Sequence, residues 1–122
     1  MLDAKSISKS FQSCICSGIE NIFLVNKTGS LVLAAKQGEA VKTLGAILSN
    51  VWSDYADAIG NSESGQELGF MIVEVESGSV VVEGVSGLYL CVQGGNDVGK
   101  IIEVGKKVKE MVESPLADVL SS

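Results

Sequence analysis

The sequence contains no histidine, one proline and three cysteines among its 122 residues. Because histidine is the most common general base and a frequent zinc ligand, its absence argues against a catalytic triad and an ordinary zinc site. An odd number of cysteines without a secretory signal favours a reducing compartment, and we expect Cys14, Cys16 and Cys91 to be ordinary buried thiols. No apolar run reaches the ~20 residues that span a bilayer, and neither end carries a lipidation motif. We therefore expect any membrane location to come through a partner.

Basic residues are outnumbered 9 to 15 by acidic ones, which gives a net charge of -6. This balance argues against nucleic acid or anionic lipid as the main partner, since both are bound chiefly by clustered lysine and arginine. Four lysines gather near the C-terminus but alternate with glutamates, which indicates a solvated helix face: Lys100, Lys106, Lys107 and Lys109. Three glutamates alternate with valines and indicate the solvated face of strands rather than a catalytic pair: Glu74, Glu76 and Glu83. We expect no catalytic site, cofactor or metal.

Residues 39–59 form the longest stretch without strong helix breakers, and their apolar residues recur at helical spacing. The predicted helix has an apolar surface wider than the ~100° of a one-sided surface helix. It consists of two seams, which predicts packing against two different surfaces. We assign to the chain's own sheet Val41, Leu48, Trp52, Tyr55 and Ile59. We assign to a partner Ala40, Leu44, Ile47 and Val51, with Thr43, Asn50 and Asp54 at the rim. Small residues are expected to let the partner's helix approach: Ala40, Gly45, Ala46 and Ala58.

The remaining chain alternates strand-like and helix-like patterns. The first predicted elements are a helix over 2–13 and strands over 19–25 and 30–36, joined by a turn at 26–29. After the long helix we expect a loop over 60–66, strands over 68–76, 79–85 and 88–93, and a helix over 97–113. Ser114 and Pro115 are expected to break this last helix, and Pro115 can begin one more helical turn through Leu120. Connections of only two residues between the last three strands enforce antiparallel pairing. The fold class is therefore α/β (α+β), a five-stranded antiparallel sheet sandwiched by helices in the order α-β-β-α-β-β-β-α, as one domain over residues 1–122.

Residues 94–100, GGNDVGK, match the spacing of a phosphate-binding loop between a strand and a helix. However, Ile101 follows where that motif needs a hydroxyl group for Mg²⁺, and the carboxylate of Asp97 would repel a phosphate. We therefore interpret Gly94 and Gly95 as a turn and Asn96 or Asp97 as the N-cap of the last helix. A small nucleotide-binding enzyme is the alternative that this motif leaves open.

Five short strings resemble the roadblock superfamily, and the similarity covers nearly the whole chain. They are residues 23–26 (FLVN), 28–31 (TGSL), 49–52 (SNVW) with Tyr55, 90–92 (LCV) and 113–116 (ESPL). The SNVW string in the long helix and the proline-leucine ending are the most specific. Within the superfamily, the chain looks like an adaptor subunit of a Ragulator complex. The glycines and serines between residues 60 and 65 and the glycine pair at 94–95 depart from that pattern.

The resemblance implies a non-catalytic scaffold subunit that forms a heterodimer with a second roadblock-fold protein through the long helix and the following strand, residues 68–75. The implied contact residues are Ala40, Thr43, Leu44, Ile47, Asn50, Val51, Asp54, Phe70, Ile72 and Val73. It further implies a lipidated Ragulator anchor subunit and Rag GTPases as partners, in mTOR and MAPK signalling at the cytoplasmic face of late endosomes and lysosomes. A roadblock-type dynein light chain that binds an intermediate chain is the alternative within the superfamily.

Overall fold

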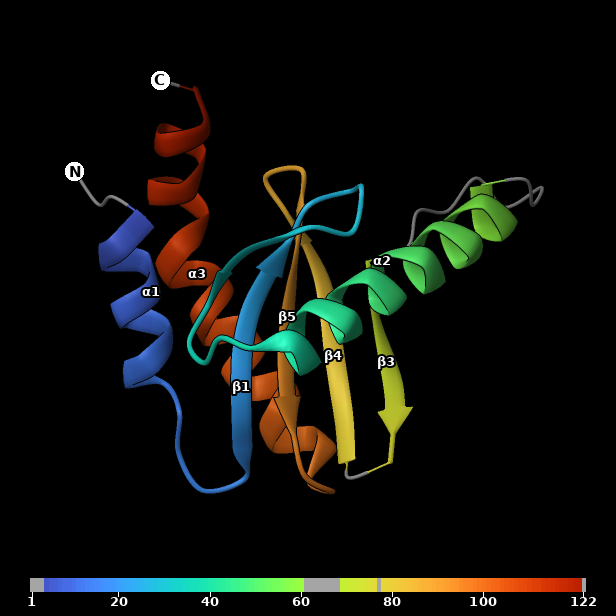
Figure 1. Cartoon of the computed structure of the whole chain (residues 1–122), viewed down its shortest axis with the longest axis horizontal. Coiled ribbons are helices and arrows are strands. Elements are labelled where there is room, and N and C mark those ends of the chain that lie inside the picture. Colours follow the sequence, from blue (N-terminus) through green and yellow to red (C-terminus); the bar gives the residue numbers. More distant parts are fainter. Residues whose placement is uncertain (1–3, 61–68, 77, 122) are drawn as a thin grey trace.

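One antiparallel sheet of five strands separates two layers of helices (Figure 1). The computed structural model describes residues 4–60, 69–76 and 78–121. In chain order the elements are α1 (Ala4–Ser13), β1 (Ile19–Val25), β2 (Leu31–Ala34), α2 (Glu39–Gly60), β3 (Phe70–Val75), β4 (Gly78–Val85), β5 (Leu88–Gly94) and α3 (Val98–Ser121). This order and the fold class are those predicted from the sequence.

The sheet joins a hairpin to a meander, with the strand order β2-β1-β5-β4-β3. The hairpin turn relies on Gly29, whose φ of 92° lies in the left-handed region that glycine adopts without strain. The meander attaches to the hairpin through β5, which pairs antiparallel with β1 from Ile19 opposite Gly94 to Val25 opposite Tyr89. This arrangement leaves β2 and β3 as the two edge strands.

Alternating side chains of the strands supply two separate cores, one on each face of the sheet. On one face α1 and α3 cover the sheet, and the buried residues of this core include Ile7, Phe11, Ile22, Leu24, Val81, Val92, Ile101 and Val108. On the other face α2 packs alone, in a core that includes Phe23, Val25, Val41, Leu48, Trp52, Val80, Val82 and Tyr89. No helix among the described residues combines the length and apolar character needed to cross a membrane.

The predicted C-terminal break of the last helix is wrong, because α3 continues through Pro115 to Ser121. Proline removes one backbone donor, but its fixed φ near −65° is compatible with helical backbone on either side. The other bounds differ by a few residues at most. Gly60, predicted to begin a loop, is the last residue of α2, and the rest of that predicted loop lies outside the described residues.

The three cysteines are free but do not share one environment. Cys91 lies in the core beneath α2, and burial raises the pKa of its thiol. Cys14 is half-buried and Cys16 is exposed, so the expectation of buried thiols is wrong for Cys16. The physical reason is position, since α1 ends at Ser13 and Cys16 lies in the surface connection that leads to β1.

Candidate partner-binding surface

One side of α2 packs on the chain's own sheet, as the first seam predicts. Val41, Leu48 and Trp52 are buried there, and the Trp52 ring lies 5.1 Å from the ring of Tyr89 on β5. Gly45 also faces this sheet, because a Cβ on it would lie 3.0 Å from a methyl group of Val25. The expectation that Gly45 admits a partner's helix is therefore wrong. Its missing side chain instead brings α2 close to β1.

A second side of α2 contacts the turn between β1 and β2. The Ser49 hydroxyl donates a hydrogen bond to the carbonyl oxygen of Lys27 at 3.1 Å. A Cβ on Gly29 would lie 3.3 Å from the backbone of Ala46, so the turn rests directly on the helix. Ala46 therefore lies beside the chain's own hairpin rather than on a surface reserved for a partner.

The third side of α2, here called the free flank, consists of Ala40, Leu44, Ile47, Val51 and Tyr55. These residues recur at three- and four-residue spacing, so they form one stripe along the helix. Leu44 and Val51 are half-buried, whereas Ile47 is 51% exposed. Tyr55 is 60% exposed, so its assignment to the chain's own sheet is wrong. It lies one helical turn beyond Val51 and extends the free flank instead. The side chain of Ile59 lies outside the described residues.

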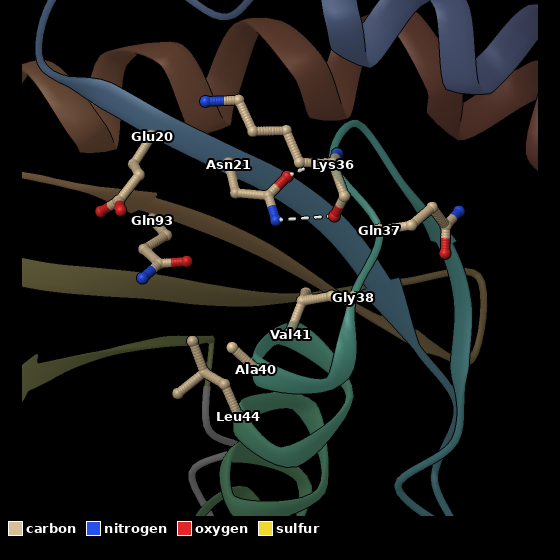
Figure 2. A pocket seen from close by; sticks show the side chains of 9 residues that line it. All are labelled: Glu20, Asn21, Lys36, Gln37, Gly38, Ala40, Val41, Leu44 and Gln93. Carbon is tan, nitrogen blue, oxygen red and sulfur yellow. Dashed lines mark hydrogen bonds between the residues drawn. The ribbon is translucent and has the colours of Figure 1, made fainter.

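Two hollows border the free flank, one at each end. The first, of about 210 Å³, lies beside the first turns of α2 and is lined by Ala40, Val41 and Leu44 together with Gln93 of β5. Figure 2 shows Asn21 at its margin, joined by two hydrogen bonds to the backbone of Lys36, the segment that leads into α2.

The second hollow, of about 380 Å³, lies between α2 and β3. Its lining consists of Val51, Tyr55 and residues 71–74. The free flank therefore does not rest on its own sheet along its whole length, and the two hollows leave room for an additional element beside α2.

The three candidate residues on β3 divide between the two faces of the sheet. Val73 lies opposite Val80 and packs into the core beneath α2. Phe70 and Ile72 lie on the other face, because Ile72 is opposite Val81, a member of the core beneath α1 and α3. The remaining rim residues of α2, Thr43, Asn50 and Asp54, are exposed. The backbone edge of β3 that points away from β4 has no paired strand among the described residues.

The predicted N-cap of α3 is confirmed at Asp97, but Gly94, predicted to lie in a turn, is the last residue of β5 and pairs with Ile19 and Ser79. The carboxylate of Asp97 accepts a hydrogen bond from the backbone amide of Lys100 at 3.1 Å, which is the geometry of a helix N-cap. The Lys100 ammonium group donates a hydrogen bond to the carbonyl oxygen of Ser17. A Cβ on Gly94 would lie 2.3 Å from the carbonyl oxygen of Gly18, so this glycine serves close backbone packing.

Of the acidic residues of the meander, Glu74 and Glu76 are exposed, whereas Glu83 is half-buried beside α3. The expected solvated strand face is wrong for Glu83, because both faces of the meander carry a core. Within residues 4–60, 69–76 and 78–121 there is no cluster of three or more potential metal-binding side chains. The exposed large apolar residues are instead the most distinctive surface feature. Of the six whose exposure the structure describes, four lie on α2 and β3, namely Ile47, Tyr55, Phe70 and Ile72, and the other two are Val32 and Met111.

Comparison with known proteins places this arrangement in a family. The Roadblock/LC7 domain model matches residues 16–94, which run from the connection between α1 and β1 to the end of β5 and include α2. A Roadblock/LC7 domain from Streptomyces avermitilis superposes with a TM-score of 0.75 at 17% identity, covering 90% of this chain and 94% of that one. MglB of Myxococcus xanthus gives 0.70 at 14% identity, with 98% and 95% covered. A structure of MglB with tetrameric arrangement gives 0.62 at 16% identity, with 95% and 86% covered.

Proposed function

We propose that this chain, which belongs to the Roadblock/LC7 domain family, is a non-catalytic adaptor subunit that pairs with a second roadblock-fold protein. The observation that carries the proposal is the free flank of α2 beside the unpaired edge of β3. The apolar stripe of half-buried Leu44 and Val51 and exposed Ile47 and Tyr55 lowers solubility unless another element covers it. An open strand edge likewise favours pairing with another chain.

The course of α2 supports one mode of pairing. Figure 1 shows α2 crossing the sheet obliquely, with its last turns extending past β3. If β3 pairs with the edge strand of a partner, the two sheets become continuous and these turns come to lie over the partner's sheet. A partner of the same fold would place its own long helix in the equivalent position, where it covers the hollows beside the free flank. The tetrameric arrangement in which MglB has been solved is compatible with association through a roadblock domain.

A single charge in the free flank tests this proposal. Replacing Ile47 with aspartate removes about 2 kcal/mol of apolar burial and places an unpaired carboxylate in the contact. We expect the dissociation constant of the pair to rise by about 100-fold or more. Val32→Asp is the matched control, because Val32 is 43% exposed and lies on the opposite edge strand. The measurement is native mass spectrometry of the complex isolated from its own cells. A complex that survives Ile47→Asp unchanged would refute the proposal.

The charges near this surface favour a partner that differs from the chain itself. Glu39 is paired with Lys42 at 3.5 Å, but Asp54 at the rim of the free flank forms no ion pair within the described part of the chain. A second copy would bring further unpaired carboxylates to the same contact, and like charges in proximity are destabilising. We therefore propose a heterodimer. The purified chain alone should then be monomeric or poorly soluble, and a stable homodimer would exclude the heterotypic pairing.

The more specific proposal is a Ragulator-like role. It rests on the SNVW string at 49–52 and the ESPL string at 113–116, which resemble the Ragulator subunit late endosomal/lysosomal adaptor and MAPK and mTOR activator 2. On this proposal a lipidated anchor subunit holds the pair at the cytoplasmic face of late endosomes and lysosomes, and Rag GTPases bind to the assembly. Affinity purification that recovers Rag GTPases supports this role, whereas recovery of a dynein intermediate chain supports the light-chain alternative.

A further inference from the structure

Phe70 and Ile72 form an apolar surface that pairing through α2 does not cover. Both side chains lie on the face of β3 opposite α2, where they are 50% and 44% exposed. The main helix contacts on this face are those of α3 with β4 and β5. In Figure 1, α3 passes behind β1 and β5, whereas β3 forms the edge of the sheet that lies farthest from α3. The helical layer of this face therefore ends before it reaches the edge strand.

Two carboxylates border this apolar surface. Glu74 follows Ile72 on the same face of β3, and Glu83 on β4 lies directly opposite Phe70. Glu83 is half-buried next to α3, since a Cβ on Gly105 would lie 2.9 Å from its carboxylate oxygen. The two ion pairs recorded among the described residues involve neither group. The surface thus combines two large apolar side chains with two carboxylates that form no ion pair within residues 4–60, 69–76 and 78–121.

We propose that this face binds an amphipathic helical segment of a third polypeptide, with apolar residues on one side and lysine or arginine beside them. A helix suits the site because the sheet presents side chains rather than backbone here, and because α1 and α3 already form a helical layer on the same face. The basic residues follow from the carboxylates of Glu74 and Glu83. The same carboxylates, together with the net charge of -6, disfavour an anionic membrane and a second copy of this chain.

The inference rests on the proposed pairing in one respect. When two β3 edges join, the partner's edge strand continues the sheet beside Phe70 and Ile72, and the face that carries these two residues stays open. Pairing through the α2 side and helix binding on this side are then separate events, because the two sets of side chains point to opposite faces. A third chain can therefore bind without displacing the partner.

The test uses a fluorescent synthetic peptide with leucine at three- and four-residue spacing and lysine at the other positions. Its binding to the full chain in complex with its partner is measured by fluorescence anisotropy. We expect binding, weakened about tenfold by the double variant Phe70→Ser, Ile72→Ser. The matched control is Val32→Ser, Met111→Ser, which replaces equally exposed apolar residues at other sites and should leave binding unchanged.

A second pair of measurements separates charge and pairing from folding. The double variant Glu74→Gln, Glu83→Gln keeps the apolar residues and should weaken binding of the lysine peptide. A peptide with glutamate in place of lysine should not bind the wild-type complex. Native mass spectrometry shows whether each variant still pairs with its partner. A variant that no longer pairs can therefore be distinguished from one that pairs but no longer binds the peptide. Absence of lysine-peptide binding, or equal binding to the Phe70→Ser, Ile72→Ser variant that still pairs, would overturn the inference.

Discussion

Replacement of Gly94 by alanine is expected to destabilise the fold, whereas the same change at its neighbour Gly95 is not. A Cβ on Gly94 would lie 2.3 Å from the carbonyl oxygen of Gly18 and 2.8 Å from the Ile101 side chain. The nearest atom belongs to backbone, so the contact is relieved only by moving the connection after α1. A Cβ on Gly95 meets nothing within 4 Å, and the φ of Gly95 is outside the left-handed region.

The expected magnitude follows from the cost of overpacking. Forcing one carbon into a packed site typically lowers the free energy of unfolding by about 1–3 kcal/mol. Because the neighbouring atom belongs to the rigid backbone, we expect a loss of about 3 kcal/mol for Gly94→Ala. For a domain of this size, that corresponds to a fall in Tm of about 10 °C. Gly95→Ala should change the free energy of unfolding by less than about 0.5 kcal/mol, or increase it slightly by restricting the unfolded chain.

Thermal unfolding followed by circular dichroism compares the two variants directly. The same assay with ATP and Mg²⁺ addresses the phosphate-loop alternative for residues 94–100. The packing explanation predicts that nucleotide leaves the Tm of the wild-type protein unchanged. If nucleotide raised this Tm, and if Gly95→Ala abolished the increase without altering the Tm of the free protein, the explanation would be refuted.

Three further predictions concern polar groups and thiols. Asn21→Ala should lower the free energy of unfolding, measured by urea denaturation, by about 2 kcal/mol. The reason is that the buried Asn21 side chain accepts hydrogen bonds from the backbone amides of Ile22 and Lys36 and donates one to the Lys36 carbonyl oxygen. An unchanged urea midpoint would contradict this. Asp97→Ala should lower the free energy of unfolding by about 1 kcal/mol in the same assay. Asp97→Asn should retain most of the wild-type stability, since the asparagine side chain can also cap α3. Iodoacetamide should alkylate Cys16 in the native protein but reach Cys91 only on unfolding, as mass spectrometry of digests would show. Burial raises the pKa of the Cys91 thiol and keeps it protonated, so raising the pH over the neutral range should not accelerate alkylation of Cys91 in the native protein.

The order of elements could be predicted because local signals agree with one another over most of the chain. The β-branched and aromatic run of β1 and the two-residue turns of the meander each specify strands without reference to distant residues. The hairpin turn required a residue with positive φ, and Gly29 supplied it. The continuation of α3 past Pro115 could not be predicted in this way, because a proline breaks helices on average and the exception depends on the surrounding backbone.

The faces of the edge strand could not be assigned from sequence. Strand residues 70–75 alternate in exposure, but their apolar residues include Phe70 and Ile72 on one face and Met71 and Val73 on the other. A strand with apolar residues on both faces gives no period-2 signal. Only the register against β4, with Ile72 opposite Val81, shows which residues lie beneath α2. The sequence therefore pointed to residues of β3 that are exposed or half-exposed, but it did not divide them between the two faces of the sheet.

The position of Tyr55 connects these two surfaces. On a helical wheel Tyr55 falls near the boundary between the seam of Leu48 and Trp52 and the seam of Ile47 and Val51, so spacing alone places it in either. Which one applies depends on how far the sheet extends beneath α2. The chain's own sheet ends at β3, and the last turns of α2 pass that edge (Figure 1). Tyr55 lines the second hollow together with β3 residues 71–74, and 60% of it is exposed. A sheet continued by a partner would cover its other side, and the same continuation would extend the surface of Phe70 and Ile72 on the opposite face.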